Sequence, residues 1–441
     1  MSNSLVDFWE YLLLPVYIGL VIGIGYLLAP KDNKRLFTNA LSLRIGGAIF
    51  FAAIYIFYYG GGDTTAYYKT AVPFVNMFFD DFQTGFRLYF SAYSIENYTS
   101  FNNNTGYPLG YIYADSQTFT VSRILVPLLI LSFKSYLLCT VLLAGLTFVG
   151  SWKLYTLFKE IFDDHRIASF SALYIPSVLF WGAGISKDTI TFTSAAYFVY
   201  GFYHLAIKKR FNLQRLFFSI ISLYLIISIK PYIFLVLLPG ILLWLLSSPV
   251  SRIRNNFLRR ITLPFIGALS GAAFVFLFNQ FSEFFGSYAA DQILEKALVT
   301  QEDLKRDYYG GNTFDIGTVD PTFLGVLSKV PIATFYGLYG PTIFQVRNIV
   351  MLFSAAENTV LAFLTLRLIF RVNIQKILKQ IADHPIFLFC LLFSLAFAFS
   401  IGFTTPNFGA LVRFKIPLMP FFVFFLMGMY KAKNAEKGLG T

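Results

Sequence analysis

Long apolar runs separated by short polar segments extend along most of the chain. Each run is close to the roughly 17–25 residues that a helix needs to cross a bilayer. The runs lie at residues 8–29, 42–60, 134–158, 167–184, 188–207, 212–229, 232–248, 261–281, 347–370, 385–403 and 415–431. This pattern predicts an all-α polytopic membrane protein with about eleven transmembrane helices in a single membrane domain, residues 1–441. No internal repeat is visible, so the pattern gives no support to an inverted-repeat transporter.

Lysine and arginine residues concentrate on one side of the predicted helices. Apart from those in the C-terminal tail, they stand on alternate connections, at Lys31, Lys34, Arg35, Arg44, Lys159, Arg166, Lys208, Lys209, Arg210, Arg215, Arg252, Arg254, Arg259, Arg260, Arg367, Arg371, Lys376 and Lys379. Positively charged connections stay in the cytoplasm. We therefore expect a multi-pass protein of the inner (cytoplasmic) membrane, with its N-terminus outside and its C-terminus in the cytoplasm. Residues 60–133 and 282–346 then form two long outer, periplasmic loops.

The amino-acid composition supports this assignment. Hydrophobic residues make up 56% of the chain and charged residues 13%, whereas soluble domains carry about a quarter charged residues. Topology accounts for the formal charge of +12, so nucleic acid is not an expected partner. The N-terminal residues lack the basic region and cleavage site of a signal peptide, which indicates a retained first helix. No metal site or disulfide framework is expected from the spacing of Cys139, Cys390, His165, His204 and His384.

The segment FYYGGGDTTAYYKTA, residues 57–71, ends the second apolar run at the outer face. Three glycines precede the carboxylate of Asp63, and Tyr67 and Tyr68 follow it. An aspartate after glycines is also a common turn residue. The glycines would let a bulky substrate approach the backbone closely. Beyond Asp63, apolar and charged positions alternate in a helix-like way, which predicts one or two amphipathic helices on the outer membrane surface.

A second outer-face segment, YIPSVLFWGAGISKDTITFTS, predicts a helix that rises, breaks at its glycines and returns. Ser186 is expected to cap the returning helix, and Asp188, in the first turn, is better explained as part of that helix start than as a catalyst. Lys187 has no such structural role, and an ammonium beside a helix N-terminus suits a bound phosphate. Lys230 is predicted at the outer end of another hairpin.

Four further charged residues fall at the outer interface or inside the membrane. Arg123, Arg347 and Arg413 are predicted at the outer interface, where cations run against the topological bias. Glu357 lies deeper in an apolar helix, where ionisable groups are costly and by default functional. Taken singly, each arginine is also explained as an interfacial anchor, and Glu357 as a partner of a buried lysine or a backbone group. Snorkelling anchors are expected at Lys69, Lys134 and Lys415.

One carboxylate and several cations at a membrane surface suit the transfer of a sugar from a lipid-linked donor. The cations would hold the donor's phosphate or diphosphate and stabilise it as it leaves. Asp63 would be the general base on an attacking sugar hydroxyl. The predicted binding residues are Arg123, Lys187, Arg347, Arg413 and, as sugar-stacking surfaces, Tyr67 and Tyr68, with Asp188, Lys230 and Glu357 as secondary candidates. No cofactor motif accompanies them.

Three short stretches, GGGDTTAYY, PSVLFWGAGISKDTI and RFKIPLMPF, resemble segments of known envelope-polysaccharide membrane proteins. Through them the chain resembles GT-C-type integral-membrane glycosyltransferases and exopolysaccharide or O-antigen polymerases of the EpsG/Wzy type. The resemblance implies a GT-C-like fold, an undecaprenyl-(di)phosphate-linked sugar donor, Asp63 as the base and Arg413 as the ligand of the lipid phosphate. The chain departs from that pattern in an extra helix before the acidic loop, a missing large outer domain and the lack of a second acid beside Asp63.

These observations lead to one preferred function and two alternatives. The preferred function is a glycosyltransferase or polysaccharide polymerase at the outer face of the inner membrane, with membrane lipids and the lipid-linked glycan donor and acceptor as its partners. A flippase or transporter for lipid-linked sugars should carry charges through the bilayer centre, whereas the predicted charges crowd the outer interface. A non-catalytic scaffold of an envelope assembly machine would use the polar loops 91–118 and 282–326 to bind a protein partner.

Overall fold

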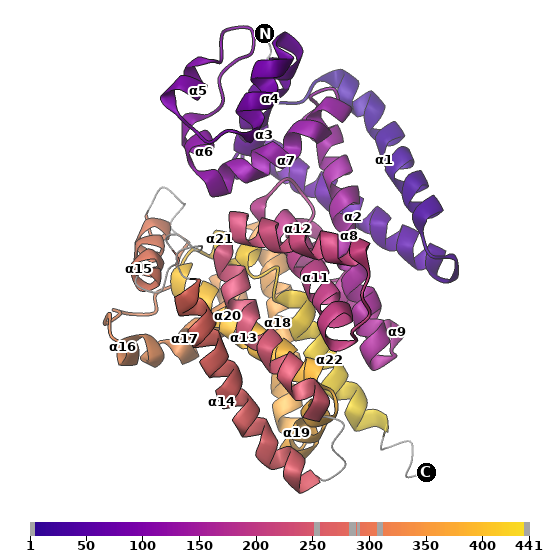
Figure 1. The fold of residues 1–441 in the computed structure, drawn as a ribbon, viewed down its shortest axis with the longest axis vertical. Helices are drawn as coiled ribbons and strands as arrows, with labels where there is room; N and C mark the ends of the chain where they lie inside the picture. The colour runs from indigo at the N-terminus through magenta and orange to yellow at the C-terminus, as the bar shows by residue number, and fades with distance from the viewer. Residues whose placement is uncertain (1–4, 251–255, 282–287, 289–291, 307–311, 436–441) are drawn as a thin grey trace. The chain divides into compact units, whose positions relative to one another are not determined.

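The computed structural model describes residues 5–250, 256–281, 288, 292–306 and 312–435. These residues form helices and no β-strand, with one isolated antiparallel bridge between Thr313 and Asn407. Their contacts divide the chain into two compact units. Unit 1 comprises Met1–Lys153, Val178–Tyr197 and Ile221–Lys230, and unit 2 comprises Leu154–Ser177, Phe198–Ile220 and Pro231–Thr441. Figure 1 traces the order of the helices along the chain.

Unit 1 contains the first seven helices, most of the eighth and parts of three later ones. These are α1 (Phe8–Leu28), α2 (Lys34–Ala53), α3 (Asp63–Asp80), α4 (Phe82–Phe90), α5 (Ile95–Thr99), α6 (Gly110–Ala114), α7 (Ser116–Leu131), most of α8 (Tyr136–Phe162), the end of α10 (Pro176–Trp181), the start of α11 (Lys187–Phe202) and the end of α12 (Leu213–Ile229). The α2 helix continues as a π-helix over Ile54–Tyr58, and a second π-helix, Tyr203–Ile207, follows α11 in unit 2.

Unit 2 is built from the remaining helices. They are α9 (His165–Leu173), α13 (Pro231–Val250), α14 (Asn256–Gln280), α15 (Ile293–Leu304), α16 (Phe323–Ser328), α17 (Val330–Tyr339), α18 (Ile349–Arg371), α19 (Ile374–Asp383), α20 (Pro385–Thr404), α21 (Phe408–Phe414) and α22 (Met419–Ala435). The short helix α10 (Pro176–Trp181) begins in unit 2 and ends in unit 1. The predicted outer loop 282–346 thus contains α15, α16 and α17.

Six helices among the described residues are long and apolar enough to cross a membrane. They are Phe8–Leu28, Lys31–Tyr58, Tyr136–Phe162, Pro231–Val250, Ile349–Arg371 and Pro385–Thr404. A seventh crossing is formed if α21 and α22, which meet at a 68° bend, are counted as one span. The protein is therefore an all-α, multi-pass membrane protein. The other predicted runs are helical too, as α9 with α10, α11, α12 and α14, and none of them is among the six helices that meet these measures within the described residues.

The predicted run 167–184 is interrupted in its middle. The α9 helix ends at Leu173 and α10 begins at Pro176. Proline has no N–H to donate and disfavours helical geometry in the residue before it, so Ile175 marks the break. The sequence prediction placed the first break later, at the glycines of residues 182 and 184, and missed this one.

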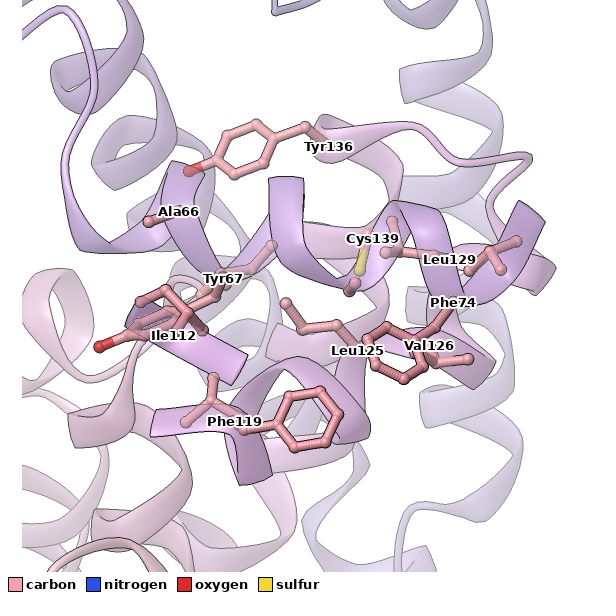
Figure 2. Close-up of a cluster of buried hydrophobic side chains, with 14 of the residues drawn as sticks. Ala66, Tyr67, Phe74, Ile112, Phe119, Leu125, Val126, Leu129, Tyr136 and Cys139 are labelled. Atoms are coloured by element: carbon pink, nitrogen blue, oxygen red, sulfur yellow. The ribbon is translucent and has the colours of Figure 1, made fainter. Parts of the chain in front are cut away.

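A buried aromatic and aliphatic cluster holds α3, α7 and α8 together in unit 1. Figure 2 shows Phe74, Leu125 and Val126 gathered between these helices. The rings of Phe74 and Phe119 have centroids 5.0 Å apart, and both side chains are buried. The predicted surface segment after Asp63 is thus two helices, α3 and α4, of which α3 packs its apolar side against α7. This packing fixes the position of the start of α3, where Asp63 lies.

The three glycines before Asp63 form the turn between the second span and α3. Gly60, Gly61 and Gly62 have φ angles of 67°, 136° and 139°, a region that residues with a side chain rarely adopt. A Cβ atom on Gly62 would lie 2.9 Å from the ring of Tyr55. The Gly62 N–H donates to the Thr65 hydroxyl, and that hydroxyl donates back to the Gly62 carbonyl. Backbone geometry therefore accounts for the glycines, which the sequence analysis assigned to making room for a substrate.

Close backbone contact joins α17 to α20 in unit 2. A Cβ atom on Gly337 would lie 2.0 Å from the Ala398 carbonyl oxygen, and one on Gly402 would lie 1.9 Å from the Ala333 oxygen. Small residues at such a crossing let two membrane helices approach until their backbones touch. The apolar α17 helix is therefore part of the packed core of unit 2, although the sequence prediction assigned it to an outer loop.

Candidate functional site

The start of α11 carries the most chemically varied residues of unit 1. Ser186 caps this helix as predicted, because its hydroxyl oxygen accepts a hydrogen bond of 3.1 Å from the Thr189 N–H. Lys187 and Asp188 are the first two residues of α11. Successive helical residues point about 100° apart, so the two side chains reach different partners.

Lys187 contacts the start of α7. Its ammonium donates a 2.6 Å hydrogen bond to the Thr118 hydroxyl and lies 3.7 Å from the Asp115 carboxylate. Asp115 is itself the N-cap of α7, where it accepts hydrogen bonds from the Gln117 N–H and from the Thr118 hydroxyl. The Lys187 side chain remains 20% exposed and that of Asp115 50%. This ion pair is therefore within reach of a ligand.

Asp63 belongs to the same electrostatic environment. Burial lowers the pKa of the Lys187 ammonium, and the negative charges of Asp115, Asp63 and Asp188 act in the opposite direction. Asp63 is exposed and lies in the first turn of α3, where a carboxylate interacts favourably with the helix dipole. The next residue, Thr64, is anchored by a 2.7 Å hydrogen bond between its hydroxyl and that of Tyr136. Asp63 and Lys187 thus both lie in unit 1, each in the first turn of a helix, and their joint action stays a prediction.

The start of α11 forms a second ion pair, which is buried, in addition to the partly exposed pair of Lys187 and Asp115. The Lys230 ammonium, just after α12, donates a 2.6 Å hydrogen bond to the Asp188 carboxylate. Only 8% of the Lys230 side chain and 1% of the Asp188 side chain are exposed. Asp188 therefore has a specific charged partner in addition to its place in the first turn of α11. The pair fixes the N-terminus of α11 against the end of α12.

The predicted aromatic residues are packing residues. Tyr67 is 4% exposed and forms part of the cluster in Figure 2, so almost none of its ring is available to a sugar. Tyr68 donates a 2.8 Å hydrogen bond from its hydroxyl to the Lys134 carbonyl and packs edge-on against Tyr136. Both tyrosines therefore have structural partners.

Arg123 takes part in a separate set of contacts along α7. It lies eight residues after Asp115, or about 12 Å further along the helix axis. Its guanidinium donates a hydrogen bond to the Ser91 carbonyl and lies 4.4 Å from the centroid of the Phe119 ring. These contacts tie α7 to the segment after α4. Arg123 thus has partners within the protein, and both its role in binding a phosphate and its role as an interfacial anchor stay predictions.

Glu357, Arg347 and Arg413 belong to unit 2. Glu357 accepts hydrogen bonds of 2.8 Å from the Ser177 N–H and 2.6 Å from the Ser177 hydroxyl. This agrees with the alternative in which Glu357 pairs with a backbone group. Arg347 is exposed just before α18, and Arg413 is half-buried in α21. That the two arginines share a pocket with Asp63 stays a prediction.

Two cations that the sequence assigned to membrane interfaces are buried instead. Lys415, predicted to be a snorkelling anchor, is 1% exposed. Its ammonium donates to the Asn358 side-chain oxygen and, over 3.2 Å, to the Gly340 carbonyl. Arg44, assigned to a cytoplasmic connection, is buried within α2, where it donates to the Thr147 and Ser151 hydroxyls and to the Gly182 carbonyl. Each of the two predictions was wrong, because the lysine and the arginine find polar partners inside the protein.

Sequence reasoning missed Asp115 and Thr118, the residues that contact Lys187 most directly. The segment YADSQTF offered a signal, since an aspartate followed by a polar turn before an apolar run is typical of a helix N-cap. With them, three carboxylates (Asp63, Asp115 and Asp188) and two ammonium groups (Lys187 and Lys230) influence one another at the start of α11. This group is named the α11 cluster below.

Comparison with known proteins assigns no function to the α11 cluster. No known protein family, characterised protein or solved structure matches this chain.

Proposed function

We propose that the protein transfers a sugar, or polymerises glycan repeat units, from a polyprenyl-phosphate- or diphosphate-linked donor at the outer face of the bacterial inner membrane. One observation carries this proposal: the partly exposed ammonium of Lys187, at the start of α11, contacts Asp115 and Thr118 at the start of α7. The exposed carboxylate of Asp63 lies in the first turn of α3, which packs against α7. A general base and a phosphate ligand are the two groups that this transfer requires of the protein.

The reaction divides between these two residues. The acceptor hydroxyl oxygen attacks the anomeric carbon of the donor, and the bond from that carbon to the phosphate oxygen breaks. Asp63 takes the proton from the attacking hydroxyl. Lys187 stabilises the negative charge that develops on the departing phosphate, assisted by the N-terminus of α11. Lys187 must exchange the Asp115 carboxylate for a phosphate oxygen, and its partial exposure supports this exchange.

The buried Lys230–Asp188 pair has a positioning role in this proposal. It holds the start of α11 in place without facing the substrate, since both side chains are enclosed. A preorganised ammonium costs no rearrangement as charge develops in the transition state. Lys230 and Asp188 are therefore secondary site residues.

The wider architecture of the proposal is a GT-C-like membrane domain with about eleven crossings, the N-terminus outside and the C-terminus in the cytoplasm. The six or seven helices long enough to cross a membrane, and the helicity of the remaining apolar runs, are compatible with it. The packed helices α3 and α4 would lie on the outer face. Arg347 and Arg413 would bind the lipid phosphate there.

The test replaces Asp63 in cells that lack the chromosomal copy of the gene. We expect short lipid-linked repeat units to accumulate on deletion, and Asp63→Asn to leave them accumulated at normal protein levels in the membrane. Asp80→Asn is the matched control, since Asp80 is an exposed aspartate at the other end of α3, and it should restore the surface glycan. Full rescue by Asp63→Asn, or unchanged glycans on deletion, would reject the catalytic role and favour a scaffold. If the purified protein moves the donor from one leaflet of a vesicle membrane to the other without forming a glycosidic bond, it is a flippase.

A further inference from the structure

Unit 2 contains a groove between α9, α18 and α22 that the proposed transfer does not use. It has a volume of about 470 Å³, within the range of roughly 300–1,000 Å³ typical of ligand sites. Most of its wall is apolar, and its middle is lined by Val360, Leu361, Leu364, Val423 and Leu426.

The two ends of the groove differ in polarity. At one end, the Lys431 ammonium lies 2.9 Å from the Asp164 carboxylate, and Arg166 stands beside them. At the other end Met419 and Glu357 line the wall, and both carboxylate oxygens of Glu357 already accept hydrogen bonds from Ser177. The carboxylate at this far end is therefore already hydrogen-bonded and does not require a polar ligand.

The end at Arg166 carries more positive than negative charge. Arg367 adds a third cation there, because its guanidinium lies 5.6 Å from the centroid of the Tyr430 ring, which lines the groove. Among the described residues that line the groove, Asp164 is the carboxylate at this end, and it is engaged by Lys431. Within the described residues neither Arg166 nor Arg367 has an acidic partner at ion-pair distance. Two exposed guanidinium groups thus remain for an anion.

The length of the groove matches one leaflet of a bilayer. Along α22 it extends from Met419 to Lys431, twelve residues or about 18 Å at 1.5 Å per residue. Half of a hydrocarbon core of about 30 Å is about 15 Å. In a multi-pass membrane protein, an apolar groove of one leaflet's length with cations at one end has the shape and charge of a single lipid.

We propose that this groove binds an anionic phospholipid, with one acyl chain between α9, α18 and α22 and the phosphate on Arg166 and Arg367. Arginine suits this role because its planar fork donates two parallel hydrogen bonds to a phosphate. The head group must carry a net negative charge, because the ammonium of a zwitterionic head group would be repelled by the two guanidinium groups. The inference does not rest on the proposed glycosyl transfer.

The experiment measures lipid binding to the purified, delipidated full-length protein in detergent. Native mass spectrometry would count bound phosphatidylglycerol and phosphatidylcholine, and thermal unfolding would be followed with each lipid. We expect one retained phosphatidylglycerol that raises the unfolding temperature more than phosphatidylcholine does. Arg166→Ala and Arg367→Ala should each weaken phosphatidylglycerol binding roughly fivefold, the usual effect of one cation near an anionic head group.

Two further variants separate the groove from its charges. Arg371→Ala is the matched control, an exposed arginine one turn beyond Arg367 and so further from the Tyr430 ring that Arg367 covers, and it should bind lipid normally. Val360→Trp should fill the groove and abolish retention while leaving all three cations in place. Equal binding of the two lipids, equal loss in Arg371→Ala, or full retention in Val360→Trp would overturn the proposal. Equal stabilisation by inorganic phosphate alone would show an anion site without a lipid chain and would also overturn it.

Discussion

The Lys230 ammonium lies 2.6 Å from the Asp188 carboxylate, and almost none of either side chain is exposed. Each charge therefore depends on the other, since an isolated ion in such surroundings has no water to solvate it. The pair joins the last residue of unit 1 to the first turn of α11.

Removing one member of this pair should destabilise the protein strongly. We expect Lys230→Met to lower the free energy of unfolding by about 3–5 kcal/mol, because it leaves the Asp188 carboxylate buried without its cation. Thermal unfolding of the purified variant in detergent would measure the loss. The double variant Lys230→Met with Asp188→Leu should recover much of it. A single variant as stable as the parent would show that the pair does not hold the start of α11.

Lys187 should affect the reaction more than the fold. We expect Lys187→Met to lower the rate of glycosyl transfer by about 10²–10³-fold, the usual effect of removing one group that stabilises developing negative charge. Its partial exposure predicts little change in the unfolding temperature. The measurement is turnover of a lipid-linked donor by purified protein. Lys208→Met, an exposed lysine at the end of the π-helix after α11, provides the control and should retain full activity.

The contact between α17 and α20 predicts a steric effect at Gly402. Leucine there would collide with the Ala333 carbonyl and separate the helices, at a cost of about 1–3 kcal/mol or more. Unfolding of Gly402→Leu would be compared with that of Gly271→Leu, because no atom lies within 4 Å of a Cβ built on Gly271 in α14. Equal unfolding temperatures for the two variants would contradict the close packing.

The start of α4 should respond to acid. The hydroxyl and N–H of Thr84 and the N–H of Gln83 donate to the Asp81 carboxylate and hold its pKa below the ordinary value of 3.8. Because the folded pKa is lowered, the stabilisation is complete above the unfolded value near 4 and is lost as the pH falls through the folded pKa. Hydrogen exchange of the α4 amides, corrected for intrinsic rates, should accelerate as the pH falls below about 4, whereas in Asp81→Asn it should change much less.

Hydrophobic length alone predicted most of the helices, because a run of about twenty apolar residues has few alternatives to a membrane helix. Local chemistry predicted the Ser186 cap, since one side chain and the N–H three residues later suffice to form it. Local patterns also placed Asp63 and Lys187 at helix starts, where the structure has them, whereas their membership of one site stays a prediction. The number of full crossings stays a prediction, because run length ignores breaks such as the one before Pro176.

The hydrogen-bond and ion-pair partners of the charged residues could not be predicted from the sequence. Lys415 and Arg44 are buried by contacts with residues 57 or more positions away, and nothing in their neighbouring residues indicates this. Asp115 meets Lys187 across 72 residues, so its place in the α11 cluster depends on how α7 and α11 pack. Sidedness follows from composition, but contact between distant segments depends on tertiary packing.

Lys415 follows in the chain the two groups that accept its hydrogen bonds. It lies at the bend between α21 and α22, in the last apolar segment, where a lysine costs several kcal/mol to insert without a partner, roughly 2.5–3.5 at a helix centre. Both groups that receive its ammonium, the Gly340 carbonyl and the Asn358 side chain, precede it in the chain. By the time the ribosome releases this lysine, its acceptors have been synthesised. The α21 and α22 helices can therefore enter the membrane beside α17 and α18, where the Gly340 carbonyl and the Asn358 side chain accept hydrogen bonds from the Lys415 ammonium.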